Sequence, residues 1–137
     1  MSREAATTAT LLITAREALE KFVEVHVDDD GALSFRHGAV PCAVQGVELV
    51  EGLAVLSLTC VVAWDLTDTD TPRAVAERSG QGLFGTLGVV ATDAGWDVTL
   101  RYAFPAAGLE EKAMGTLLML VVSSASSMRV ELTGLTA

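Results

Sequence analysis

LAVLSLTCVVAW, which runs from Leu53 to Trp64, carries the strongest strand pattern in this chain. Its odd-numbered positions mix Ser57 and Thr59 with apolar residues. Its even-numbered positions are all apolar, namely Ala54, Leu56, Leu58, Cys60, Val62 and Trp64. Apolar residues at a spacing of two indicate a β-strand with one face in the core. The mixed opposite face predicts a central strand whose second side is partly covered, for which a partner subunit is one candidate.

Two shorter strand patterns precede this segment. Residues 33–36 predict a short strand, and a turn at 37–38 leads into a second strand that begins near Val40. Pro41 predicts that this second strand lies at a sheet edge, because proline cannot donate a ladder hydrogen bond. A turn near 50–52 would pair it with the segment from Leu53 onward, so that the numbers of paired residues sum to 102.

In that hairpin the two cysteines of the chain, Cys42 and Cys60, face each other on the core side. Their spacing fits no zinc motif, because there is no CxxC and no second pair. Two interpretations stay open: a redox pair, or two buried reduced thiols that act as small apolar residues. A shift of the turn by one residue would remove the pairing.

Helical patterns flank and interrupt the strands. Apolar residues at helical spacing predict a first helix over about 4–24, which the acidic turn Asp28-Asp29-Asp30-Gly31 follows. Thr71 and Pro72 predict the N-cap and first residue of a second helix. A last helix is predicted over about 109–132, with two glutamates in its first turn where the helix dipole favours them.

Two more strand patterns complete the chain. They cover 87–92 and 96–104, and a tight turn at 93–95 joins them. The resulting order, α-βββ-α-ββ-α, predicts a single α+β domain over residues 1–137. Its helices would pack on a mainly antiparallel, five-stranded sheet.

Charge and composition exclude some classes of partner. The 137 residues carry a formal net charge of -9, with a pI near 4.5 and 50% hydrophobic residues. An acidic protein repels nucleic acid and anionic membranes and attracts basic or amphipathic segments, although acidity also simply keeps an apolar domain soluble. The longest unbroken apolar run, 117–122, is too short to span a bilayer, and no signal peptide is recognised. We therefore expect a cytoplasmic protein.

Several local patterns occur in a recognisable order. The acidic turn at 28–31 follows the first helix, and VLSLTCVV at 55–62 forms a long third strand. A block then runs through 83–90, 94–98 and 102–105 to Leu109 and 117–118. Along this block a helix, a strand, a tight turn, a strand that ends near a proline and a long apolar helix follow in order. Over nearly its whole length the chain resembles the YbjN family, whose members share the type III secretion chaperone-like fold. Members often carry an asparagine in the helix before the fourth strand, where this chain has SGQGLF at 79–84.

This resemblance implies an intracellular, often dimeric protein without assigned catalysis. Through its fold it implies the binding of extended segments of client proteins. It supplies no catalytic, metal-binding or cofactor-binding residues.

Two motifs match binding sites in their letters only. Gly80-Gln81-Gly82-Leu83-Phe84-Gly85 satisfies G-x-G-x-x-G, but a helix precedes it and a strand follows, which inverts the order of a dinucleotide site. An EF-hand loop built on Gly31 would place His26 first and His37 twelfth, and both are wrong for calcium. We expect a loosened helix end at the glycines and a solvated turn at the aspartates.

The remaining polar candidates are also weak. His26 and His37 lack a third metal ligand or an orienting carboxylate. The loop with Asp65, Asp68 and Asp70 suits helix capping, and could also hold a cation weakly or dock a basic partner. The serines near the end of the last helix lack a nucleophile elbow and suit close packing, namely Ser123, Ser124, Ser126 and Ser127.

The large aromatic residues of the second half have two interpretations. They pack in the core and at strand ends, or some of them line a hydrophobic groove for a partner. They are Trp64, Trp96, Tyr102 and Phe104.

Together these patterns predict a non-catalytic, protein-binding module. We expect a homodimer that uses exposed apolar strips on the last helix or the strand from Leu53 to bury a second subunit or an extended or amphipathic partner segment. The alternative is a small-ligand-binding protein or enzyme with a pocket between sheet and helices. A permanent structural subunit of a larger complex is a third possibility.

Overall fold

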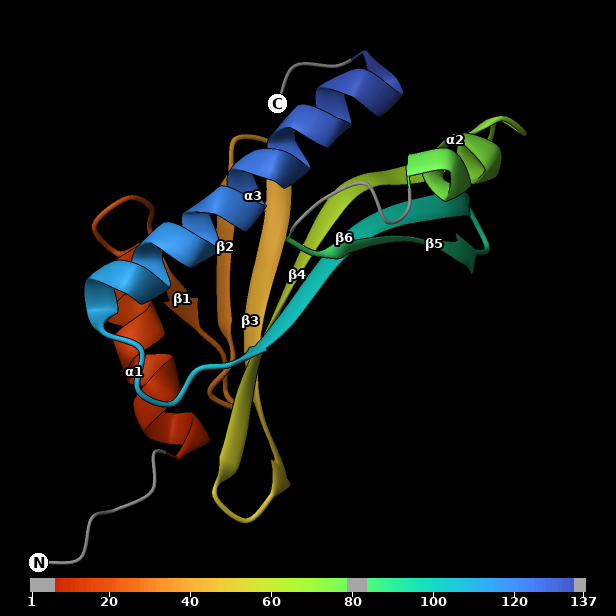
Figure 1. Ribbon diagram of the computed structural model, residues 1–137. Coiled ribbons are helices and arrows are strands. Elements are labelled where there is room, and N and C mark those ends of the chain that lie inside the picture. Colours follow the sequence, from red (N-terminus) through yellow and green to blue (C-terminus); the bar gives the residue numbers. More distant parts are fainter. Residues whose placement is uncertain (1–6, 79–83, 135–137) are drawn as a thin grey trace, which may run out of the picture.

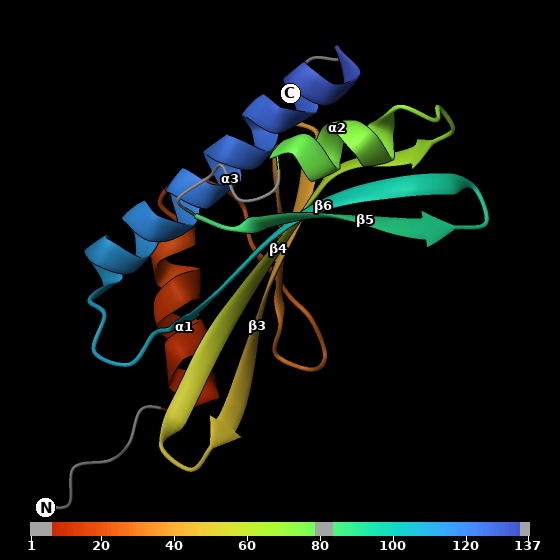
Figure 2. The same ribbon diagram turned by 45° about the vertical axis from the view of Figure 1, so that its right-hand side comes forward.

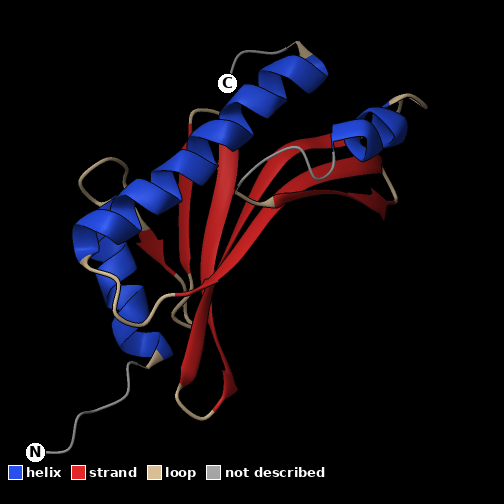
Figure 3. Ribbon diagram, viewed as in Figure 1, coloured by secondary structure: helices blue, strands red, loops and turns tan. Residues whose placement is uncertain are grey.

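The structure is a computed structural model that describes residues 7–78 and 84–134. Its elements are α1 (Thr8–Leu19), β1 (His26–Val27), β2 (Leu33–His37), β3 (Val40–Val50), β4 (Leu53–Leu66), α2 (Thr71–Arg78), β5 (Thr86–Thr92), β6 (Gly95–Pro105) and α3 (Glu111–Thr133). The strands form one sheet in the order β1-β2-β3-β4-β6-β5 (Figures 1 and 3). Every neighbouring pair in it is antiparallel. The predicted α+β class with an antiparallel sheet is therefore confirmed.

The predicted count of five strands is wrong, because the described sheet has six. The additional strand, β1, contains only His26 and Val27, which pair with Ser34 and Leu33. Both of its residues are exposed. Two residues are too few to show a period of two, so the pattern in the sequence could not indicate this strand.

The central hairpin follows the predicted register over most of its length. Pairs from Cys42–Cys60 to Glu48–Ala54 keep the sum of 102, and a bulge then shifts the last pair to Val50–Leu53. β4 lies between β3 and β6, as expected of a central strand. Its core-facing side chains from Ala54 to Val62 are at most 1% exposed.

Pro41 does not mark an edge strand, because β3 lies between β2 and β4. The ladder between β3 and β4 begins at Cys42, one residue after the proline. The missing N–H of Pro41 therefore removes no hydrogen bond from that ladder.

Helices α1 and α3 lie across the same face of the sheet (Figure 2). α1 begins after the N-cap Thr7, whose side chain and that of Thr10 form a capping box. The predicted helix over 4–24 is too long at its C-terminal end, since α1 stops at Leu19, whose carbonyl accepts the N–H groups of both Phe22 and Val23. Phe22, one of the apolar residues at helical spacing on which that prediction rested, is 61% exposed. Glu4 lies outside the described residues.

α3 is the core helix. Eight of its residues are buried, and a left-handed glycine, Gly134, caps its C-terminus. A Cβ built on Gly115 would lie 3.2 Å from the Cβ of Ala18, so α1 and α3 approach closely there. By length and apolar composition alone α3 is long enough to cross a membrane, although 44% of the apolar window is buried in the fold. A buried core helix passes the same test.

α2 begins one residue earlier than the sequence predicted. Thr71 is its first residue, and the carbonyl of Asp70 accepts the first helical hydrogen bond from Ala74. Asp70 therefore occupies the N-cap position predicted for Thr71, whose hydroxyl donates to Asp68. The acidic loop before α2 thus has a structural role in starting this helix.

Candidate functional site

The C-terminal half of β3 forms an open sheet edge. β2 pairs with β3 only from Val40 to Val44. From Gln45 to Val50, β3 pairs with β4 alone and has no other strand neighbour in the described part of the chain. In an antiparallel ladder every second residue directs its N–H and C=O away from the paired strand. This segment therefore presents unpaired backbone groups to a further strand.

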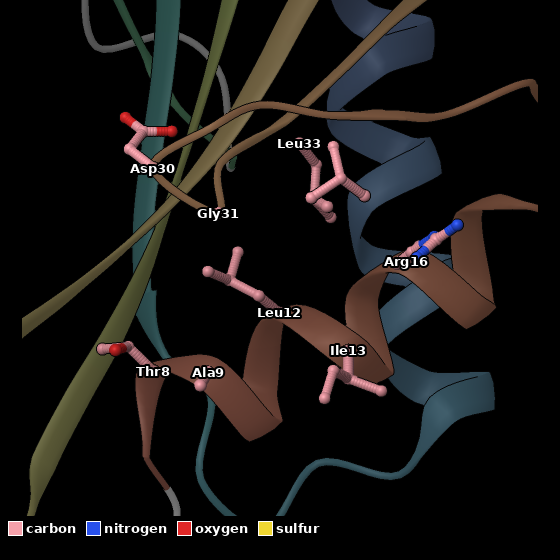
Figure 4. Close-up of a pocket in the computed structure, with 9 residues that line it drawn as sticks. Thr8, Ala9, Leu12, Ile13, Arg16, Asp30, Gly31 and Leu33 are labelled. Atoms are coloured by element: carbon pink, nitrogen blue, oxygen red, sulfur yellow. The ribbon is translucent and has the colours of Figure 1, made fainter.

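A groove of about 300 Å³ lies between α1 and the corner that joins β1 to β2. It is largely apolar, and Figure 4 shows Leu12 pointing toward the corner at Gly31. Ile13 is 56% exposed at its mouth. The other lining residues are Thr8, Ala9, Arg16, Val27, Asp30 and Leu33.

The groove adjoins the open edge of β3 through Gly46. A Cβ built on this glycine would lie 2.7 Å from the Cβ of Thr8 and 3.4 Å from a methyl group of Leu12. Thr8 and Leu12 line the groove as well, so one wall of the groove rests directly on the open strand. Any larger residue at position 46 would push α1 away from β3.

Acidic residues surround the groove and the edge. Asp30 lines the groove, and its carboxylate accepts a hydrogen bond from the Ala32 N–H. Glu48 and Glu51 lie on and beside the open strand and are exposed. The one cation of the lining, Arg16, forms an ion pair with Glu20. The local charge is therefore negative, as is that of the whole chain.

The projecting tip of the β3–β4 hairpin adds exposed apolar surface to this region (Figures 1 and 2). The large apolar residues there are between 40% and 63% exposed, namely Val47, Leu49, Val50 and Leu53. Such a cluster on one protruding element favours contact with another molecule.

The cysteines meet as the sequence predicted. Cys42 lies opposite Cys60, both are buried and free, and their sulfur atoms are 3.6 Å apart. Hydrogen bonding to Cys42 and then burial raise the pKa of the Cys60 thiol above its ordinary value.

The two histidines lie in different environments. His26 is exposed and lies 3.6 Å from the carboxylate of Asp28. His37 Nδ1 lies 2.6 Å from the hydroxyl oxygen of Ser126 on α3. Ser126 is only 6% exposed, so this short contact ties the helix to the end of β2 rather than presenting a nucleophile. No local pattern could signal this pairing, because the residues lie 89 positions apart.

The acidic turns have local hydrogen-bond partners. Asp28 accepts hydrogen bonds from the Ser34 hydroxyl, and Asp97 accepts one from the N–H of Asp65. Within the described residues, no group of three or more metal-binding side chains gathers. The glycine motif falls largely on 80–83, outside the described residues; β5 begins directly after its last glycine.

Three aromatic rings pack together on and beside β6. Tyr102 makes an edge contact with Phe84 at 5.9 Å and stacks on Phe104 at 5.4 Å, measured between ring centroids. Phe104 is buried, and Tyr102 and Trp96 are half-buried. This arrangement favours the packing interpretation for these residues, none of which lines the groove beside α1.

Trp64 departs from its predicted core position and is 38% exposed. A bulge at Val62 inserts an extra residue into β4, which shifts the alternation of the residues that follow. The guanidinium of Arg129 lies over the Trp64 ring, 4.6 Å from its centroid. Its Nη1 donates to the carbonyl of Val62. Sequence reasoning missed this buried arginine because it lies in an otherwise regular helical pattern.

Comparison with known proteins finds no matching family model and no matching curated protein.

Proposed function

We propose that the protein is a non-catalytic, protein-binding module that binds an extended segment of a partner protein. The observation that carries this proposal is the open edge of β3 from Gln45 to Val50 beside the apolar groove under α1. A segment that adds to this edge would form backbone hydrogen bonds with β3. Its alternate side chains would enter the groove across Gly46, where Thr8 and Leu12 form the wall.

The charge around the edge defines the chemistry of the segment. Glu48, Glu51 and Asp30 favour lysine or arginine beside the apolar residues. A second copy of this chain fits the same edge poorly, because the two copies would bring like-charged glutamates together. The proposed partner segment is therefore extended, basic and apolar at alternate positions.

Binding of a synthetic peptide tests this function. We expect a labelled peptide of alternating valine and lysine to bind, measured by fluorescence anisotropy, and to bind more weakly as salt rises. Ile13→Glu should weaken binding at least about tenfold, since it places a carboxylate where an apolar side chain would pack, and tenfold is about 1.4 kcal/mol. Val90→Glu is the matched control, because Val90 is 50% exposed on β5, away from the groove.

Two further peptides make the result specific. Replacing lysine by glutamate should abolish binding through charge repulsion, and methylating alternate backbone nitrogens should abolish it by removing strand hydrogen bonds. If the N-methylated peptide binds equally well, strand addition is wrong. Such a result would instead favour the alternative function, a pocket for a small apolar ligand.

The homodimer belongs to the same proposal but uses another surface. Leu120 on the outer face of α3 is 48% exposed and lines two shallow hollows of about 510 and 440 Å³. Its neighbours in these hollows include the small residues Ala113, Thr116, Ser123, Ser124 and Ser127. Small side chains let a second helix approach closely. An antiparallel pair of α3 helices would bring Lys112 of one copy toward the Glu131 end of the other.

Solution mass tests the dimer. We expect light scattering to give twice the chain mass of 14.3 kDa at several concentrations. Leu120→Glu should reduce the mass to that of one chain, whereas Val90→Glu should leave the dimer intact. A wild-type protein that stays monomeric at every concentration would refute the dimer. It would not bear on peptide binding, which uses another surface.

The resemblance to the YbjN family, the type III secretion chaperone-like fold and a cytoplasmic location complete this proposal. What supports the family and the fold is the order of helices and strands around one antiparallel sheet. The cytoplasmic location is proposed on the resemblance alone.

A further inference from the structure

Cys42 and Cys60 form a close pair of thiols in the centre of the sheet. They lie directly opposite each other on β3 and β4, with 3.6 Å between their sulfur atoms. A disulfide requires a sulfur separation of about 2.0 Å, so the side chains need only small rotations to form the bond.

The two thiols differ in their access to solvent. Cys60 is 0% exposed and lines none of the described hollows. Cys42 is 5% exposed, so of the two thiols it is the one that a small reagent from solvent reaches first. The hydrogen bond to Cys42 and burial raise the pKa of the Cys60 thiol, which keeps it protonated and a poor nucleophile toward a reagent from solvent.

We propose that Cys42 and Cys60 are a peroxide-reactive dithiol, in which Cys42 is attacked first and Cys60 resolves it. The thiolate of Cys42 attacks one oxygen of hydrogen peroxide, the O–O bond breaks, and hydroxide leaves and is protonated to water. This produces a sulfenic acid at Cys42. The sulfur of Cys60 then attacks the Cys42 sulfur, and its proton leaves with the hydroxyl group as a second water. Two thiols and one peroxide thus give one disulfide and two waters.

The disulfide would join β3 and β4 near the base of the projecting hairpin (Figure 1). It restricts the unfolded chain more than the folded one, because the strands are already adjacent. We expect oxidation to raise the midpoint of thermal unfolding by roughly 5–10 °C, and dithiothreitol to reverse the shift.

Mass spectrometry of the wild-type protein tests the proposal directly. The folded protein is treated with hydrogen peroxide, then unfolded and alkylated with iodoacetamide. We expect a monomeric product that has lost about 2 Da and takes up no iodoacetamide, because both sulfurs are in the disulfide. Treatment with dithiothreitol after the peroxide and before the iodoacetamide should restore two alkylation sites.

Two variants separate the roles of the thiols. Cys60→Ala should stop at the sulfenic acid, which dimedone traps on Cys42. Cys42→Ala should give no dimedone adduct in the folded protein, since Cys60 is fully buried. The proposal is overturned if folded wild-type protein keeps both thiols open to alkylation after peroxide treatment. It is also overturned if dimedone labels Cys60, and the wild-type result decides even if a variant does not fold.

Discussion

Gly95→Ala is expected to destabilise the protein by about 4 kcal/mol, because two effects act at this position. The backbone of Gly95 has a φ of 137°, a conformation that residues other than glycine rarely adopt. A Cβ built there would also lie 2.4 Å from the carbonyl oxygen of Leu66. Neither the β5–β6 turn nor the end of β4 can move away without breaking the pairing between Leu66 and Trp96. Urea unfolding followed by circular dichroism measures the loss.

Gly52→Ala is the matched control for this substitution. Gly52 also has a positive φ, of 84°, but nothing lies within 4 Å of the position of its Cβ. We expect a loss of about 1 kcal/mol, which reports backbone strain without the steric contact. If Gly95→Ala and Gly52→Ala lose the same free energy of unfolding, local movement relieves the contact with the Leu66 carbonyl.

The central hairpin shows how much of this fold the sequence determines. Strict alternation from Ala54 to Val62 indicates both the strand and its buried face, and one turn then fixes the partner of every residue. The pairing of Cys42 with Cys60 followed from this arithmetic alone. The register fails only beyond Glu48, at a bulge whose extra residue has no signature in a pattern of apolar residues.

The candidate site could not be predicted in the same way. The groove depends on where β2 begins relative to β3, and on the contact of α1 with Gly46, which joins residues far apart in sequence. Pro41 and Trp64 mislead for a related reason. Proline usually marks an edge strand, but the β3–β4 ladder begins one residue after Pro41. Alternation predicts a buried Trp64, but the bulge of β4 at Val62 shifts the residues that follow it. Local periodicity carries no information on such junctions between elements.

The proposed peptide-binding edge and the dithiol share the β3–β4 hairpin. Its free edge and apolar tip face outward, whereas the cysteine pair lies at its buried base. Oxidation at the base would stiffen the strand to which a partner segment adds. Peptide affinity of the oxidised and reduced forms can therefore be compared without changing any residue.

Arg129→Ala is expected to destabilise the protein by about 3 kcal/mol. Arg129 is 8% exposed, and it supplies the hydrogen bond that the carbonyl of Val62 lacks at the bulge of β4. An unsatisfied buried carbonyl costs about 1–3 kcal/mol. The contact of the guanidinium with the Trp64 ring contributes about 0.5–2 kcal/mol more. Urea unfolding monitored by tryptophan fluorescence measures the combined effect.

Arg129→Met separates packing from charge, because methionine fills much of the volume of the arginine stem. Burial of the guanidinium has its own penalty, since its Nε has no hydrogen-bond partner in the described part of the chain. We expect the methionine variant to lose about half as much free energy of unfolding as the alanine variant. The Val62 carbonyl stays unpaired in both, but methionine keeps the packing. A methionine variant as stable as wild type would contradict this account. It would show that the free-energy cost of burying the guanidinium equals the stabilisation from its contacts with Val62 and Trp64.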